Sequence, residues 1–82
     1  MFRIAVGNWG DLKKALEGVG IAENDVDELS TAIQEDGKTT GQRVTAWIGR
    51  NAGKVFDHGL QLGTSVGTTV LTEYVKRHFG LP

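Results

Sequence analysis

The chain has 82 residues, of which 39% are hydrophobic and 23% are charged, and its formal net charge is −1. This composition is typical of one small soluble domain, and the absence of cysteine excludes disulfide bonds and thiolate metal sites. The first residues lack the basic start and apolar core that are typical of a secretory signal. The uncharged stretch 59–72 is too short to span a bilayer. We therefore expect a cytoplasmic protein without a cofactor.

Charge is distributed unevenly along the chain. Residues 1–37 contain eight acidic and three basic side chains, whereas residues 38–82 contain six basic and two acidic ones. Complementary halves of this kind favour an acidic N-terminal half that folds over a basic C-terminal half, within one chain or between two. The alternative is that the basic half binds phosphates or anionic lipid.

Residues 1–8 are predicted to form an extended arm. Phe2, Ile4 and Val6 recur with the period of two that is typical of a strand, but no second strand is predicted to pair with them. We therefore expect an arm that lies over the helices. The alternatives are pairing between two copies of the chain and disorder.

Residues 9–37 are predicted to form a helical hairpin. Asn8 or Asp11 can cap its first helix, and the second helix begins near Ala22, a poor cap for which Asn24 is the predicted substitute. In both helices apolar residues recur at the spacing that places them on one face. The predicted buried residues are Leu12, Ala15, Leu16 and Val19 in the first helix, and Val26, Leu29, Ala32 and Ile33 in the second.

Residues 38–82 are predicted to form a linker and a long C-terminal helical segment, as one helix or two stacked pieces. At 3.6 residues per turn its apolar residues fall on one broad face, and mainly polar residues cover the other. Glycine and hydroxyl residues at 59–65 weaken helix propensity, so a bend is expected there. The predicted apolar face consists of Val44, Ile48, Ala52, Val55, Phe56, Leu62, Val66, Val70 and Tyr74.

Glycines spaced four residues apart are the most distinctive feature of this segment. In a helix, Gly59, Gly63 and Gly67 would form a glycine zipper, a flat groove that a second helix can approach closely. Because each glycine lowers helix propensity by about 1 kcal/mol relative to alanine, a compensating contact is expected. We predict it either inside the monomer, against Leu16 or Ile33, or between two copies. The candidate interface residues are Trp47, Gly59, Leu60, Gly63, Val66, Gly67, Val70 and Leu71.

No arrangement of side chains predicts an enzyme or a metal site. His58 and His78 are the imidazoles of the chain, and on a continuous helix they would lie about 30 Å apart. Asp57 and His58 are neighbours, so on a helix their side chains would point about 100° apart and would not act as an acid–base pair. Residues 7–10 follow a possible strand but lack the pattern of a phosphate-binding loop.

Three segments of the chain carry, in order, a resemblance to a known family: the acidic ENDVDELSTAIQEDG, then VTAWIGRNAGKV after a short linker, and a glycine-rich helix that ends in LTEYVKRHFG. Over residues 12–80 they resemble the C-terminal part of AbiTii-domain proteins, bacterial proteins named after a phage abortive-infection system. The resemblance implies a bacterial source, a cytoplasmic setting and a part in phage defence. It implies no catalytic residue.

The sequence as a whole predicts an all-α fold in a single domain, residues 1–82. A helical hairpin packs on a long or broken glycine-rich helix, with an extended N-terminal arm. We expect a protein–protein interaction domain that forms a homo-oligomer, most simply a dimer, or binds another protein. The first alternative is a membrane-active effector whose C-terminal helix inserts into a bilayer. The second is a nucleic-acid-binding domain that uses the basic residues Arg43, Arg50, Lys54, Lys76 and Arg77.

Overall fold

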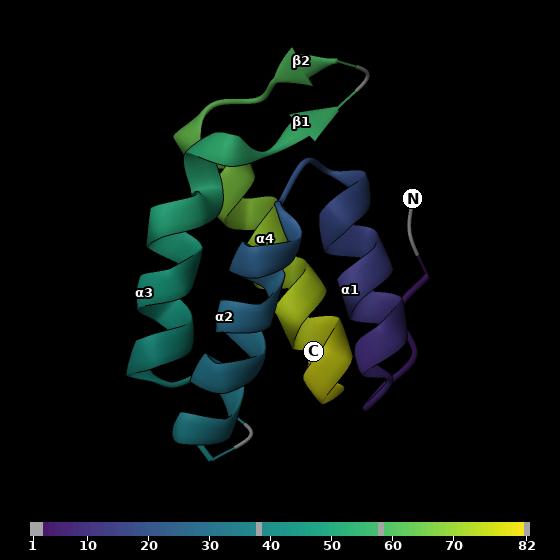
Figure 1. Ribbon diagram of the computed structural model, residues 1–82, viewed down its shortest axis with the longest axis vertical. Helices are drawn as coiled ribbons and strands as arrows, with labels where there is room; N and C mark the ends of the chain where they lie inside the picture. Colours follow the sequence, from purple (N-terminus) through teal and green to yellow (C-terminus); the bar gives the residue numbers. More distant parts are fainter. Residues whose placement is uncertain (1–2, 38, 58, 82) are drawn as a thin grey trace.

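The computed structural model describes residues 3–37, 39–57 and 59–81. Within these residues, four α-helices pack around one core and a short two-stranded hairpin projects from one end (Figure 1), so the predicted all-α class is confirmed. The elements in chain order are α1 (Trp9–Gly18), α2 (Glu23–Glu35), α3 (Gln42–Asn51), the 3-10 turn η1 (Ala52–Lys54), β1 (Phe56–Asp57), β2 (Leu60–Gln61) and α4 (Thr64–Phe79).

The first two helices, α1 and α2, are present and bury their apolar residues as predicted. Asn8 caps α1, because its side-chain Oδ1 accepts a hydrogen bond from the Asp11 N–H at 3.0 Å. α2 begins after Ala22, whose side chain makes no capping bond, so the prediction that Asn24 caps this helix is wrong. Acidic residues in the first turn of α2 meet the positive end of the helix dipole and partly replace the cap.

The N-terminus of α3 is held by an acidic side chain from the end of α2. Asp36 directly follows α2, and its two carboxylate oxygens accept hydrogen bonds from the backbone N–H groups of Arg43 (3.2 Å) and Val44 (2.8 Å). These bonds satisfy N–H groups that have no partner within the helix. Gly41 lies against the same side chain, where an added Cβ would be 2.7 Å from the Asp36 Cγ. The linker after α2 therefore fixes how α3 begins.

The C-terminal segment forms two helices, α3 and α4, so the alternative of one continuous helix is wrong. The alternative of two helical pieces agrees with the structure. The described residues between them, 52–57 and 59–63, contain η1 and the hairpin, which is a longer interruption than the bend predicted at 59–65. Gly59 and Gly63 have φ angles of +77° and +87°, a region that other residues rarely adopt. The predicted single apolar face is therefore divided among α3, η1, the hairpin and α4.

The described part of the N-terminal arm, residues 3–8, contains neither helix nor strand. Ile4 is buried in the core, and the backbone N–H of Gly7 donates to the His78 carbonyl at 2.8 Å. The arm therefore lies against the end of α4, as the sequence predicts for an arm over the helices. Phe2, the first apolar residue of the predicted arm, lies outside the described residues.

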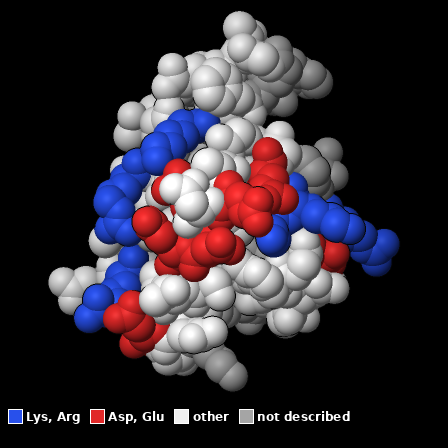
Figure 2. Space-filling model, in the orientation of Figure 1, with Lys and Arg blue, Asp and Glu red and all other residues white. Residues whose placement is uncertain are grey.

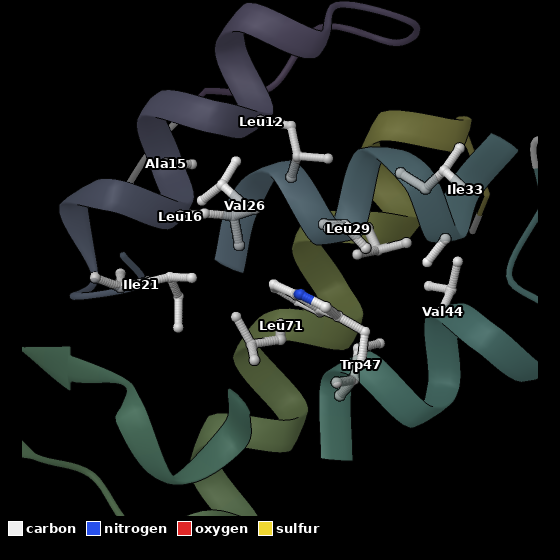
Figure 3. Packing of buried hydrophobic residues seen from close by; sticks show 14 of the residues in the cluster. Leu12, Ala15, Leu16, Ile21, Val26, Leu29, Ile33, Val44, Trp47 and Leu71 are labelled. Carbon is white, nitrogen blue, oxygen red and sulfur yellow. The ribbon is translucent and has the colours of Figure 1, made fainter. Parts of the chain in front are cut away.

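Trp47 of α3 points into the core, toward Leu29 of α2 and Leu71 of α4 (Figure 3). Its side chain is fully buried, and its Nε1–H donates to the Asp25 carbonyl at 2.8 Å, so the polar group of the indole is satisfied. Trp47 is therefore a core residue, although the sequence places it among the candidate interface residues. The same cluster contains Leu12, Leu16, Ile21, Val26, Ile33, Val44, Val55 and Val75.

Candidate interaction surface

Residues 59–69 form an uncharged stretch of surface that includes part of the hairpin and the first turns of α4. Every residue in this stretch is exposed except Leu62, which is half-buried, and Gly67, which is buried. Leu60 and Val66 are apolar, yet they expose 70% and 48% of their surfaces. In the view of Figure 2, by contrast, charged side chains lie over α1, α2 and α3. We call residues 59–69 the uncharged segment.

The register of the hairpin explains why Leu60 is exposed. β1 and β2 pair so that Leu60 lies opposite Asp57 and Gln61 opposite Phe56. Successive side chains of a strand point to opposite faces. The Gln61 amide donates to the Gly53 carbonyl of η1 and so faces the body of the protein, which leaves Leu60 on the outer face.

The predicted interface residues divide into two groups in the structure. Trp47, Gly67 and Leu71 are buried inside the chain, so the prediction that they contact a partner is wrong. The physical reason is that η1 and the hairpin turn α4 back against α3, which encloses these residues between the helices. The second group is accessible and consists of the exposed Gly59, Leu60, Gly63 and Val66, with the half-buried Val70.

Gly67 packs inside the monomer. A Cβ added to it would lie 1.9 Å from the Ala52 carbonyl oxygen, so α4 and η1 approach at a distance that only glycine permits. The predicted close contact within the monomer therefore exists, but its partner is Ala52 and not a residue of the helical hairpin. Gly59 and Gly63 lie outside the helices, so the prediction of a glycine zipper along one helix is wrong.

The acidic and basic halves of the chain pair with each other across α2 and α3 (Figure 2). Lys54 Nζ lies 3.0 Å from the Asp25 carboxylate, and Arg43 lies 3.5 Å from the Glu35 carboxylate. The predicted packing of the acidic half on the basic half is confirmed, and it occurs within one chain. A groove of about 890 Å³ between α2 and α3 is lined by side chains of both signs, so it offers a phosphate no surface of uniform positive charge.

The basic residues of the nucleic-acid alternative lie in two places. Arg43 and Arg50 belong to α3 and Lys54 to η1, whereas Lys76 and Arg77 lie in the last turns of α4. Arg77 Nη2 is 2.8 Å from a Glu73 carboxylate oxygen, so three of these five residues are paired with carboxylates. Their charge is partly neutralised by the chain itself.

A second hollow, which we call the arm pocket, lies between the N-terminal arm, the start of α1, α2 and the end of α4 and has a volume of about 480 Å³. Burial lowers the pKa of His78 below its usual value of 6.5, and a hydrogen bond to the Asn8 backbone opposes this shift. The imidazole is therefore neutral at neutral pH. The lining includes the apolar Trp9, Ile33 and Phe79 and the polar Ser30, Gln34 and His78.

The chemistry of the other candidate residues is limited. Within the described residues, no group of three or more His, Asp or Glu side chains could hold a metal ion. His58, and with it the Asp57–His58 pair, lies outside the described residues. In that same described part of the chain, no helix has the length and apolar character needed to cross a membrane.

No protein-family model, curated protein or solved structure matches this chain. The resemblance of residues 12–80 to AbiTii-domain proteins therefore rests on the sequence features alone.

Proposed function

We propose that this chain is a protein–protein interaction domain that associates with a second copy of itself, most simply as a dimer, through the uncharged segment. The observation that carries the proposal is the exposure of Leu60 and Val66 within a stretch that has no charged side chain. The fully buried cores of protein interfaces are depleted in charge and enriched in apolar residues. Covering these two side chains removes apolar surface from water.

The absence of charged residues from the uncharged segment favours a second copy of the chain as the partner. In a two-fold contact the same surface of each subunit meets its counterpart, so a charged residue near the axis faces an identical charge and repels it. The uncharged segment avoids this repulsion. Its short apolar and hydroxyl side chains, such as those of Val66 and Thr69, also permit close approach. Because the segment is small compared with a standard interface, we expect weak association.

The test is the mass of the protein in solution across a concentration series, measured by light scattering or sedimentation. The wild type should dimerise as its concentration rises, and Val66→Asp or Leu60→Asp should remain monomeric with unchanged helicity. Val6→Asp is the matched control, since Val6 is also apolar and 69% exposed but lies in the arm. A wild type that remains monomeric into the submillimolar range, with its stability intact, would contradict the proposal.

The setting we propose is a bacterial, cytoplasmic phage-defence system of the abortive-infection type, and the support for it is the AbiTii resemblance. In that setting, removal of the gene from its bacterium should raise the number of plaques formed by at least one phage. A copy carrying Val66→Asp should fail to restore resistance, whereas Val6→Asp should restore it. Equal plaque numbers with and without the gene over a broad phage panel would refute the setting but not the self-association.

A further inference from the structure

The groove between α2 and α3 has an acidic wall and a basic wall. Glu28 and Glu35 line it from α2, and Arg43 and Arg50 line it from α3. In each helix the two charged residues are seven positions apart, which is close to two turns, so their side chains lie on the same face. The groove therefore presents opposite charges along its two sides, in two successive levels.

The level formed by Glu28 and Arg50 is not paired in the monomer. Both residues are exposed, and neither forms an ion pair within the described residues. Arg43, in contrast, lies 3.5 Å from the Glu35 carboxylate. A partner can therefore bind one carboxylate and one guanidinium of this groove without displacing an ion pair of the monomer.

The space between the charged residues is lined by the small side chains of Thr31, Ala32 and Ala46. Small side chains at a contact allow a further helix to approach closely. The two charged levels are about 10 Å apart along the helices, and a helix lying along the groove repeats its contacts at this seven-residue spacing. In an extended segment, residues on one face recur about every 7 Å, which does not match. The groove therefore fits a helix better than a strand.

We propose that this groove binds a helix of a partner protein whose basic residues run along one edge and whose acidic residues run along the other. The basic edge faces Glu28 and Glu35, and the acidic edge faces Arg50. Charge complementarity assigns this occupant, because a helix with a single sign of charge is repelled by one of the two walls. The groove is separate from the uncharged segment, so the inference goes beyond the proposed self-association.

The test uses two synthetic helical peptides of equal composition, each with about three seven-residue repeats. In the first, lysines follow one edge of an alanine stripe and glutamates the other, whereas in the second the two residues alternate along both edges. Each is titrated into the full-length ¹⁵N-labelled protein, and amide shifts are followed by NMR. We expect saturable shifts at Thr31, Ala46 and Arg50 with the first peptide. The dissociation constant of the second should be about tenfold higher, because several exposed ion pairs of modest strength are lost.

Two neighbouring acidic residues of α2 provide a matched pair of variants. Glu28 lines the groove, whereas Asp27 is exposed and is not among the described residues that line it. Glu28→Arg should raise the dissociation constant of the first peptide about tenfold, since it places a positive charge against the basic edge. Asp27→Arg makes the same change of charge and should leave binding unchanged. Val66→Asp should bind the peptide as the wild type does, so this test does not depend on self-association.

Three results with the peptides would overturn the proposal: no saturable shift in the wild type, equal affinity for the two peptides, or unchanged binding to a folded Glu28→Arg protein. A fourth is a shift of the same amides with rising concentration of the Val66→Asp protein alone. That result would assign the groove to a second copy of the chain instead of a partner helix.

Discussion

The α2–α3 pair and the uncharged segment differ in two respects: how the N-terminus of the helix is capped, and whether the exposed surface carries charge. Asp36 binds the N-terminal N–H groups of α3, and acidic side chains of α2 pair with Arg43 and Lys54. The N-terminus of α4, in contrast, follows Gly63 and has no side-chain cap. The surface beside it exposes Leu60 and Val66 without any charge.

This difference separates residues that hold the monomer together from residues that are free to bind a partner. Arg43 of α3 and Lys54 of η1 find acidic partners in α2, so a second protein gains little from these charges unless it displaces those partners. The exposed apolar groups of the uncharged segment find none in the monomer. Substitutions in the first region should therefore change stability, and those in the second should change association.

The largest expected effect is that of Trp47→Ala. Removal of this fully buried indole leaves a cavity and removes one hydrogen bond to the Asp25 carbonyl, and should lower the free energy of unfolding by about 3–5 kcal/mol. Chemical denaturation followed by circular dichroism provides the measurement. Leu60→Ala, on the exposed side of the comparison, should change the same free energy by less than about 0.5 kcal/mol. Similar losses of unfolding free energy for both variants would contradict the division between residues that stabilise the monomer and residues that bind a partner.

Gly67→Ala should have the next largest effect. Because the new Cβ would lie 1.9 Å from the Ala52 carbonyl oxygen, α4 and η1 must separate, at an expected cost of about 3 kcal/mol. Gly49→Ala is the control, since Gly49 lies within α3 and nothing surrounds its Cβ position within 4 Å. That substitution should raise the midpoint of thermal unfolding, because alanine favours a helix by about 1 kcal/mol. If Gly67→Ala leaves the stability of the protein unchanged, α4 and η1 do not pack as described.

Asp36→Ala should have an intermediate effect. It removes the two hydrogen bonds to the N-terminus of α3, and loss of a helix cap costs about 0.5–2 kcal/mol. Asp36→Asn retains one of the two acceptor oxygens and loses the charge, so it should cost less than Asp36→Ala. Urea unfolding of the three proteins at neutral pH tests this order. An Asn variant as unstable as the Ala variant would show that a single accepted hydrogen bond, without the second carboxylate oxygen and its charge, does not hold α3.

The smallest expected effect is a pH dependence that arises from His78. Its pKa is lowered in the folded protein, so the unfolded chain binds more protons as the pH falls through 6.5 and below. The contribution to stability is therefore complete above the unfolded pKa and is lost as the pH falls toward the folded one. Thermal midpoints at about pH 7.5 and 5.5 should fall less for His78→Gln than for the wild type. An equal fall in both proteins would show that His78 does not contribute.

Local patterns in the sequence were sufficient to predict the helices of the N-terminal half. The spacing of apolar residues placed Leu12 and Leu16 on one face of α1 and Val26 and Leu29 on one face of α2, and all four are buried. Asn8 was recognisable as a cap because a short polar side chain before a helix can bond to its free N–H groups. The charge asymmetry likewise predicted that the acidic half would cover the basic one.

The candidate interface could be predicted only in part from the sequence. Leu60 and Val66 were recognised and are exposed, while Trp47 and Leu71 were assigned to the same surface and are buried. The arm pocket was not predicted, because its lining comes from the arm, the start of α1, α2 and α4. Two of its aromatic residues, Trp9 and Phe79, lie near opposite ends of the chain, and no sequence pattern indicates that they meet.

Sequence periodicity determined the helical class and the buried faces of α1 and α2, and composition determined the uncharged character of residues 59–69. Only the tertiary structure decided that α4 turns back on α3, since Gly59 and Gly63 fit a helix pattern by spacing alone but adopt positive φ angles in a hairpin. A glycine has no Cβ, so its conformational preference is weak and its neighbours in space determine its role. For Gly67 that neighbour is the Ala52 carbonyl, which no local pattern could identify.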